Sequence, residues 1–417
     1  MRPQSRDEFE TALICALPLE FDAVEALFDE HYDEFHPAYA RQRGDANWYR
    51  TGRIGRHNIV LACLPGMGKG SAASVASSLR VSFVGVNLAL VVGICGGIPF
   101  PSEQTEIILG DVIISDSVVE YDFGRQYPDG FQQKSSVKDT LNRDIRTFLA
   151  GLKTYRMHNQ LQDRLLTHLK DLQTHMDGKW QYPGIAQDRL FKPSYRHKHH
   201  HQARCICANC QSSGDPVCDE VFESDCSTLG CMGGLVQRNR LNAESPNPLV
   251  HFGTVASADT VMKSGEHRDR LAKVNKVIGF EMEGAGVWDN LPCVIIKGVC
   301  DYADSHKNKE WQDYAAATAA SCTKAFLESR PEITRECKFS CVLYRFHVHT
   351  DLESAKNPVS WFVPFQRNKN FVGRESQLSQ LEHGLFVDEG FSKMALFALG
   401  GMGKTSIALE LAYRARE

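Results

Sequence analysis

The sequence lacks an apolar run long enough to cross a membrane, and its first ten residues, MRPQSRDEFE, lack the apolar core of a secretory signal. It also lacks a marked excess of either charge, since the formal net charge of the 417 residues is −4 at pH 7. A chain this close to neutrality gives no reason to expect binding to nucleic acid or to a membrane surface. These absences predict a protein of the reducing cytoplasm with two or three domains.

Cysteine is abundant but unevenly spread. A histidine-rich run at 195–201 (YRHKHHH) is followed by six of the 14 cysteines: Cys205, Cys207, Cys210, Cys218, Cys226 and Cys231. In a reducing compartment such a cluster indicates metal before disulfides, and thiolate and imidazole are ligands that suit zinc. The spacing C-x-C-x-x-C, with single cysteines after it, matches no zinc-finger signature that we can name. Two interpretations therefore stay open: a structural zinc site, and a polar loop without metal.

Three carboxylates are expected to meet at one edge of a sheet. Residues 294–300 (VIIKGVC) read as a buried strand, and Asp301 follows its end. Glu283 precedes a run of small residues that starts a helix, and Glu20 follows a predicted strand at 11–16. Ligands of open α/β sheets bind outside the carboxyl ends of the strands, where these side chains would lie.

Further strands are predicted at 48–51, 58–63, 89–98, 110–119 and 249–256, and an alanine-rich helix at 311–329. The fold class that follows is α/β, with a mixed central sheet flanked by helices. From about 132 to 248 the strand pattern breaks down, although residues 139–176 could form two helices.

The acidic motif E-M-E at 281–283, followed by C-D after the strand, resembles the nucleoside phosphorylase and nucleosidase superfamily. The resemblance covers residues 11–327, so that residues 1–330 would form the domain and about 132–248 an insertion. It implies that the glycine turn at 95–97 contacts the ribose and the nucleophile. The substrate-binding residues that it implies are Cys95, Gly96, Gly97, Val261, Met262 and Met282.

The resemblance also implies a mechanism without metal or organic cofactor. Asp301 would protonate the leaving base, Glu283 would hold the ribose hydroxyls and Glu20 would activate water. Phosphorylases of the superfamily hold phosphate at three positions that are Glu20, Val91 and Ile94 here, so hydrolysis is expected. The resemblance thus implies a homo-oligomeric purine N-ribosyl hydrolase acting on adenine nucleosides or nucleotides, ATP included. A purine nucleoside phosphorylase, an inactive nucleoside-binding sensor module and an interaction scaffold remain as alternatives.

A second motif lies near the carboxyl end of the sequence. After a predicted linker at 331–370, residues 371–417 hold a strand, the loop GGMGKT at 400–405 and a helix. These are the parts of a phosphate loop, in which Gly401, Gly403, Lys404 and Thr405 would bind phosphates and Mg²⁺. The preceding F-V-G-R-E resembles NB-ARC and NACHT signalling ATPases of fungal immune-type receptors. Because no second acidic strand follows, we expect only the start of such a domain, with ATP and Mg²⁺ bound only in the complete ATPase.

Overall fold

The structure is a computed structural model that describes residues 2–32, 36–134, 137–138, 142–175, 178–212, 214–242, 246–331, 367–368, 371–386 and 404–416. The chain divides into two compact units, Met1–Arg335 and Glu336–Glu417. In the second unit, α9 (Glu375–Phe386) and α10 (Lys404–Arg416) share a small apolar cluster. Gly401 and Gly403 lie outside the described residues, and Lys404 and Thr405 begin α10. The predicted phosphate loop therefore stays a prediction.

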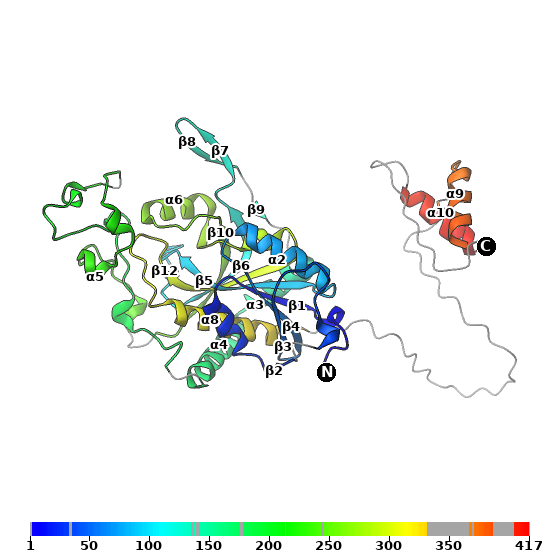
Figure 1. The fold of residues 1–417 in the computed structure, drawn as a ribbon, viewed down its shortest axis with the longest axis horizontal. Helices are drawn as coiled ribbons and strands as arrows, with labels where there is room; N and C mark the ends of the chain where they lie inside the picture. The colour runs from blue at the N-terminus through cyan, green and yellow to red at the C-terminus, as the bar shows by residue number, and fades with distance from the viewer. Residues whose placement is uncertain are drawn as a thin grey trace. The chain divides into compact units, whose positions relative to one another are not determined.

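A mixed sheet forms the centre of the first unit (Figure 1). Its strands among the described residues are β1 (Thr11–Cys15), β2 (Glu30–His31), β3 (Tyr49–Ile54), β4 (His57–Cys63), β5 (Leu88–Gly97), β6 (Val112–Glu120), β9 (Val137–Lys138), β10 (Val250–Ser257), β11 (Val277–Glu281) and β12 (Cys293–Asp301). Their order is β11-β10-β6-β12-β5-β1-β4-β3-β2, with β9 on β6. Strands β7 (Gly124–Tyr127) and β8 (Gly130–Gln133) form a separate hairpin that projects from the unit (Figure 1). The predicted mixed α/β fold is confirmed.

One end of the sheet closes on itself. β11 pairs in parallel with β10, and also antiparallel with β5, where Gly279 faces Gly97 and Phe280 faces Gly96. β5, β12, β6, β10 and β11 therefore form a closed ring of strands. The ring brings the carboxyl end of β11 beside the glycine-rich end of β5, which the sequence patterns did not predict.

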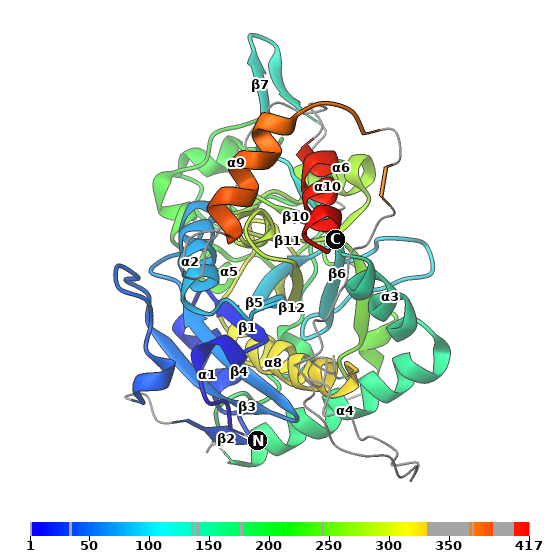
Figure 2. The ribbon, with the colours of Figure 1, turned by 90° about the vertical axis from the view of Figure 1, so that its right-hand side faces the viewer.

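Helices cover the sheet. α8 (Gln312–Ser329) is buried along most of its length and packs on β12 and β5, with α1 (Pro18–Glu25) and α4 (Tyr155–His175) against it. Figure 2 shows α8 and α4 side by side along one face. A Cβ on Gly298 of β12 would lie 2.0 Å from the carbonyl oxygen of Ala315, so glycine there allows α8 to approach closely. α2 (Lys69–Ser82) packs against α7 (Gly284–Trp288).

The predicted helices at 139–176 are present as α3 (Arg143–Leu152) and α4. After them, residues 178–212 and 214–242, here called the Cys/His segment, contain only short helices, of which α5 (Cys226–Leu229) is one. α6 (Gly265–Asn275) then leads into β11. No described helix combines the length and the apolar character needed to span a bilayer.

Candidate functional site

A pocket of about 680 Å³ opens where β1, β5, β11 and β12 end. Eight of the nine residues that the sequence assigned to catalysis and substrate binding line it: Glu20, Cys95, Gly96, Val261, Met262, Met282, Glu283 and Asp301. The ninth, Gly97, lies outside the wall and is packed against Val299, which a Cβ would meet at 2.6 Å. The expected convergence of the three carboxylates on one pocket is thus present.

The Glu20 carboxylate is anchored by the backbone around it. Glu20 lies in the first turn of α1, and its Oε2 accepts hydrogen bonds from the amides of Ala16 (2.8 Å) and Leu17 (2.9 Å). Its Oε1 accepts a third, at 2.7 Å, from the amide of Ile94 on β5. Burial raises the pKa of Glu20 above its ordinary value, although Lys297 and these amides oppose the shift. A fixed carboxyl group with a raised pKa is a stronger base than an exposed one.

Glu283 shares a buried cation with Glu20. The Nζ of Lys297 on β12 lies 3.1 Å from Oε2 of Glu283 and 3.9 Å from Oε1 of Glu20. All three side chains are nearly inaccessible to solvent. Burial favours the neutral amine, but the carboxylates of Glu283 and Glu20 outweigh it and raise the pKa of Lys297. The lysine therefore carries its charge between the two acids.

Glu281 fixes the turn that presents Glu283. Its Oε2 accepts hydrogen bonds from the amides of Glu283 (2.9 Å) and Gly284 (2.8 Å), where β11 gives way to α7. Burial, followed by the charge of Glu283, raises the pKa of Glu281. Gly68 adds an amide 3.4 Å from Oε1 of Glu283 and has φ +107°, a conformation that suits glycine.

Asp301 ends β12 and also lines the pocket. Its Oδ1 accepts a hydrogen bond from the amide of Ala303 at 2.8 Å, and its Oδ2 lies 3.2 Å from Nζ of Lys307. Ala303 has φ +53°, which is uncommon for a residue with a Cβ. A Cβ on Gly96 would lie 2.9 Å from Oδ1 of Asp301, so glycine leaves room for the carboxylate. The backbone therefore holds one oxygen of Asp301 in a fixed position.

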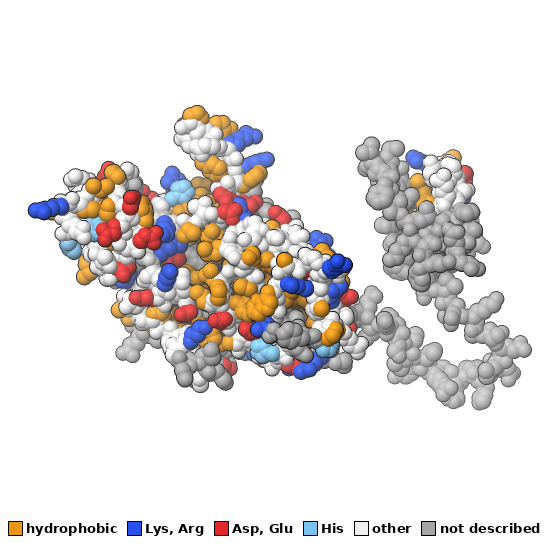
Figure 3. Space-filling model, viewed as in Figure 1, with side chains coloured by type: hydrophobic (Ala, Val, Ile, Leu, Met, Phe, Trp, Pro, Cys, Tyr) orange, Lys and Arg blue, Asp and Glu red, His pale blue; other side chains and the backbone are white. Residues whose placement is uncertain are grey.

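The other walls of the pocket differ in polarity. Val261, Met262, Phe280 and Met282 give it an apolar side. Lys263, Lys307 and Lys309 also line it, and the Cys/His segment contributes residues 222–225 together with His197. The exposed acids of that segment include Asp219, Glu220, Glu223 and Asp225, and Figure 3 shows acidic side chains gathered on this part of the surface. The pocket can thus offer apolar contacts to one part of a ligand and charged groups to another.

Five of the six predicted metal-ligating cysteines fall into two groups with histidine. His199, Cys205, Cys207 and Cys218 form one group, and His197, Cys226, Cys231 and His306 form the other. Cys210 belongs to neither, because its Sγ lies 3.4 Å from Nε of Arg196 and faces the carbonyl oxygens of Ser212 and Asp215. The lone histidine at 306, far along the sequence from the cysteines, was not predicted.

Lys297, Lys307 and Glu281 were also missed as site residues. Lys297 left a visible signal, because it is the only charged residue in the apolar run at 294–300. A lysine in a buried strand requires a carboxylate partner, and two were already predicted nearby. Together, the anchored Glu20, the Lys297–Glu283 pair and Asp301 bring three carboxyl groups to one pocket, and carboxyl groups can give or accept protons there.

The chain is similar in sequence to several known proteins. A family model for the phosphorylase superfamily matches residues 10–176. The chain is 32% identical over 421 residues to a nucleotide-binding leucine-rich repeat (NLR)-like protein of Hyaloscypha variabilis, an alignment that covers 99% of this chain and 37% of that protein. It therefore spans little more than a third of the length of this relative.

Two shorter proteins align along nearly their whole length. Futalosine hydrolase of Helicobacter pylori superposes with a TM-score of 0.45 and 15% identity, covering 78% of this chain and 100% of its own. A 5′-methylthioadenosine/S-adenosylhomocysteine nucleosidase of Mycobacterium bovis is 30% identical over 327 residues, which are 77% of this chain and 97% of the relative. An identity of that size along almost an entire relative, together with the family match, shows that the chain belongs to the phosphorylase superfamily.

Proposed function

We propose that the chain hydrolyses the N-glycosidic bond of purine nucleosides or nucleotides, and that adenine compounds, ATP among them, are its substrates. The observation that carries the proposal is the anchored Glu20 carboxylate, which shares one pocket with Glu283 and Asp301. The nucleosidase relative from Mycobacterium bovis, whose name specifies adenosine derivatives, supports both the reaction class and the base.

The reaction breaks the bond between the ribose C1′ and the base nitrogen and forms one between C1′ and a water oxygen. Asp301 gives a proton to the leaving base, and Glu20 takes a proton from the attacking water. Glu283 binds the ribose hydroxyls, and its charge favours the oxocarbenium-like transition state. Nζ of Lys297 donates a hydrogen bond to Oε2 of Glu283 and holds that carboxylate in place. The apolar wall of Val261, Met262 and Phe280 receives the purine.

Hydrolysis is favoured over phosphorolysis by the groups around Glu20. A phosphate dianion placed there would face a carboxylate, and the nearest ammonium, on Lys297, is already shared by two acids. Burying an unpaired dianion is costly. Lys263, Lys307 and Lys309 also line the pocket, where they supply positive charge for a 5′-phosphate chain.

The test is to measure purine release from adenosine, guanosine, inosine and their mono-, di- and triphosphates, with and without inorganic phosphate. We expect free adenine and a sugar product with a free anomeric hydroxyl, at a rate that added phosphate does not change. Ribose-1-phosphate, or a rate that requires phosphate, would establish a phosphorylase. Ligand binding without turnover of any compound would establish a sensor module.

We further propose that this domain is the effector of a signalling ATPase, as the alignment with the NLR-like protein suggests. The chemistry then belongs to the first unit alone, because every residue of the pocket lies within it. The chain cut after residue 335 should release base at a rate close to that of the whole chain. Loss of turnover from a folded, truncated protein would contradict this division.

A further inference from the structure

The Cys/His segment has little to hold it together besides its cysteines and histidines. Its own apolar cluster is small, consisting of Phe191, Cys207, Val221, Leu229 and Cys231. Most of its described residues are in turns, bends and single-turn helices. A segment with so little core usually needs a cross-link, which a structural metal can supply.

The first group, here called the His199 site, consists of His199, Cys205, Cys207 and Cys218. Nδ1 of His199 lies 3.6 Å from Sγ of Cys205 and 3.4 Å from Sγ of Cys218. The Sγ atoms of Cys207 and Cys218 are 3.7 Å apart. Around a tetrahedral zinc ion, ordinary bond lengths place nitrogen and sulfur about 3.6 Å apart and two sulfurs about 3.8 Å apart. The distances match the edges of that tetrahedron and exclude a disulfide, whose sulfurs are about 2.05 Å apart.

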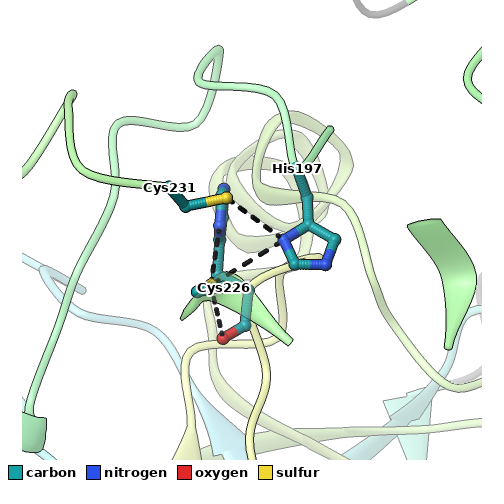
Figure 4. Close-up of side chains that lie close together, drawn as sticks. His197, Cys226 and Cys231 are labelled. Atoms are coloured by element: carbon teal, nitrogen blue, oxygen red, sulfur yellow. Dashed lines mark hydrogen bonds between the residues drawn. The ribbon is translucent and has the colours of Figure 1, made fainter. Parts of the chain in front are cut away.

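The second group, here called the His306 site, consists of His197, Cys226, Cys231 and His306. Nδ1 of His197 lies 3.8 Å from Sγ of Cys226 and 3.6 Å from Sγ of Cys231, and Figure 4 shows these three side chains pointing toward one another. Nδ1 of His306 lies 3.4 Å from Sγ of Cys226. These distances also fit a tetrahedral zinc ion, with two sulfur and two nitrogen ligands.

Two of the three histidine rings are held in the orientation that a metal ligand needs. The Nε2 atoms of His197 and His306 lie 2.9 Å and 3.1 Å from the carbonyl oxygens of Ser224 and Tyr195. The Nε2 of His199 is buried and has no hydrogen-bond partner among the described residues; a carboxylate oxygen of Glu220 lies 3.6 Å from it. An acceptor at Nε2 fixes the proton there and leaves the Nδ1 lone pair for the metal, an arrangement common around ligating histidines.

We propose that the Cys/His segment binds two zinc ions, one at each site, and that the zinc of the His306 site fastens this segment to the catalytic pocket. His306 comes from the loop after β12, five positions after Asp301, whereas its three partners come from the Cys/His segment. The carbonyl oxygen of Ser224 accepts a hydrogen bond from Nε2 of His197, one of the proposed ligands. Residues 222–225 line the pocket, as does Lys307. The ion therefore links a wall of the pocket to the loop that follows Asp301 and carries Lys307.

The first experiment counts metal in the whole chain purified without chelator. Elemental analysis should find two zinc ions per chain. His306→Ala and Cys207→Ser should each lose one, and the double variant should lose both. Cys210→Ser is the matched control: it removes a buried cysteine of the same segment and should keep both ions. Unaltered zinc content in His306→Ala or Cys207→Ser, or metal-free wild-type protein that takes up no zinc when titrated with it, would overturn the proposal.

A second measurement does not depend on variants that fold. Wild-type protein exchanged with cobalt(II) should show the visible absorption of tetrahedral cobalt and a sulfur-to-metal charge-transfer band. Chelation should then increase amide hydrogen exchange at residues 222–225, while exchange in α8 remains unchanged. An octahedral cobalt spectrum would overturn the two sites, and chelation that removes zinc without changing exchange at 222–225 would overturn the link to the pocket.

Discussion

Lys297 donates a 3.1 Å hydrogen bond from Nζ to Oε2 of Glu283, and neither side chain is more than 5% exposed. Glu20 lies on the other side of the ammonium, 3.9 Å away. One cation thus serves two buried carboxylates, and removal of the cation would leave both of them unpaired. Loss of Lys297 should therefore affect both the stability of the fold and the chemistry of the pocket, because both acids also line the pocket.

Lys297→Met should therefore destabilise the first unit and stop catalysis. Breaking a buried ion pair by removing one partner costs about 3–5 kcal/mol, because the remaining charge is left buried. Chemical denaturation should show a loss of that size. The matched control is Lys153→Met, which removes the largely exposed ion pair with Asp116 and should cost no more than about 1 kcal/mol.

The destabilisation of Lys297→Met should depend on pH. Burial raises the pKa of Glu20 and of Glu281 in the folded protein, and the charge of Lys297 opposes both shifts. Without the lysine the two pKa values rise further, so the folded state binds more protons than the unfolded state. Stability is then retained below the ordinary glutamate pKa and falls as the pH rises through the raised values. Denaturation midpoints with equal pH dependence in variant and wild type would contradict this account.

Asp301→Asn should abolish base release and leave the fold intact. The amide oxygen can still accept the hydrogen bond from Ala303, but the side chain no longer has a proton to give to the base. Loss of a general acid typically slows a reaction by about 10²–10⁴-fold. Single-turnover rates and melting temperatures, with Asp116→Asn as a half-buried control outside the pocket, separate the two effects. Activity within a few-fold of wild type would show that another group protonates the base.

Glu20→Ala should remove hydrolysis while a nucleoside still binds. In the wild type Glu20 must be ionised to accept a proton from water, and its pKa is raised by burial. The acidic limb of kcat/KM should therefore lie above the ordinary glutamate pKa of about 4.3. The profile is measured from below that value to neutrality, and binding to the variant by calorimetry. A rate that stays constant through this range would exclude Glu20 as the base.

The elements of the fold were accessible to sequence patterns because strands and helices here follow local periodicity. β12 is predicted by its apolar run, and the three carboxylates of the pocket are predicted by their places at strand ends and helix starts. The pairing of β11 with β5 that closes the ring was not predicted, because strand pairing depends on contacts between segments that are distant in the sequence. For the same reason Gly97 was assigned to the site, although the antiparallel pairing leaves Gly96 on the pocket and packs Gly97 against Val299.

The cysteine cluster illustrates the same limit. Its composition indicated metal, but the division into two ligand sets depends on how the chain turns back on itself. Cys210 is close in sequence to Cys207, yet Arg196 lies against its sulfur. His306 is remote in sequence, yet its Nδ1 lies 3.4 Å from Cys226. The spacing of the cysteines in the sequence could therefore not show that Cys210 belongs to neither group, or that His306 belongs to one of them.

Gly93 offers a test of the Glu20 position that leaves every ionisable group in place. It pairs with Lys297 across β5 and β12, and a Cβ there would lie 2.0 Å from Oε1 of Glu20 and 2.2 Å from its Cδ. Gly93→Ala must therefore displace the carboxylate from the amide of Ile94. We expect overpacking to cost about 1–3 kcal/mol in stability. Base release should fall far more than nucleoside binding, because the displaced group acts on water.

Gly66→Ala is the control for this substitution, since a Cβ at Gly66 meets nothing within 4 Å. That variant should match the wild type in turnover and denaturation midpoint. The decisive comparison is the ratio of kcat to the nucleoside Kd in the two variants, measured at a temperature where both are folded. If Gly93→Ala turned over substrate as fast as Gly66→Ala, water activation would not require the Glu20 carboxylate at its observed position, and the base would have to be sought elsewhere in the pocket.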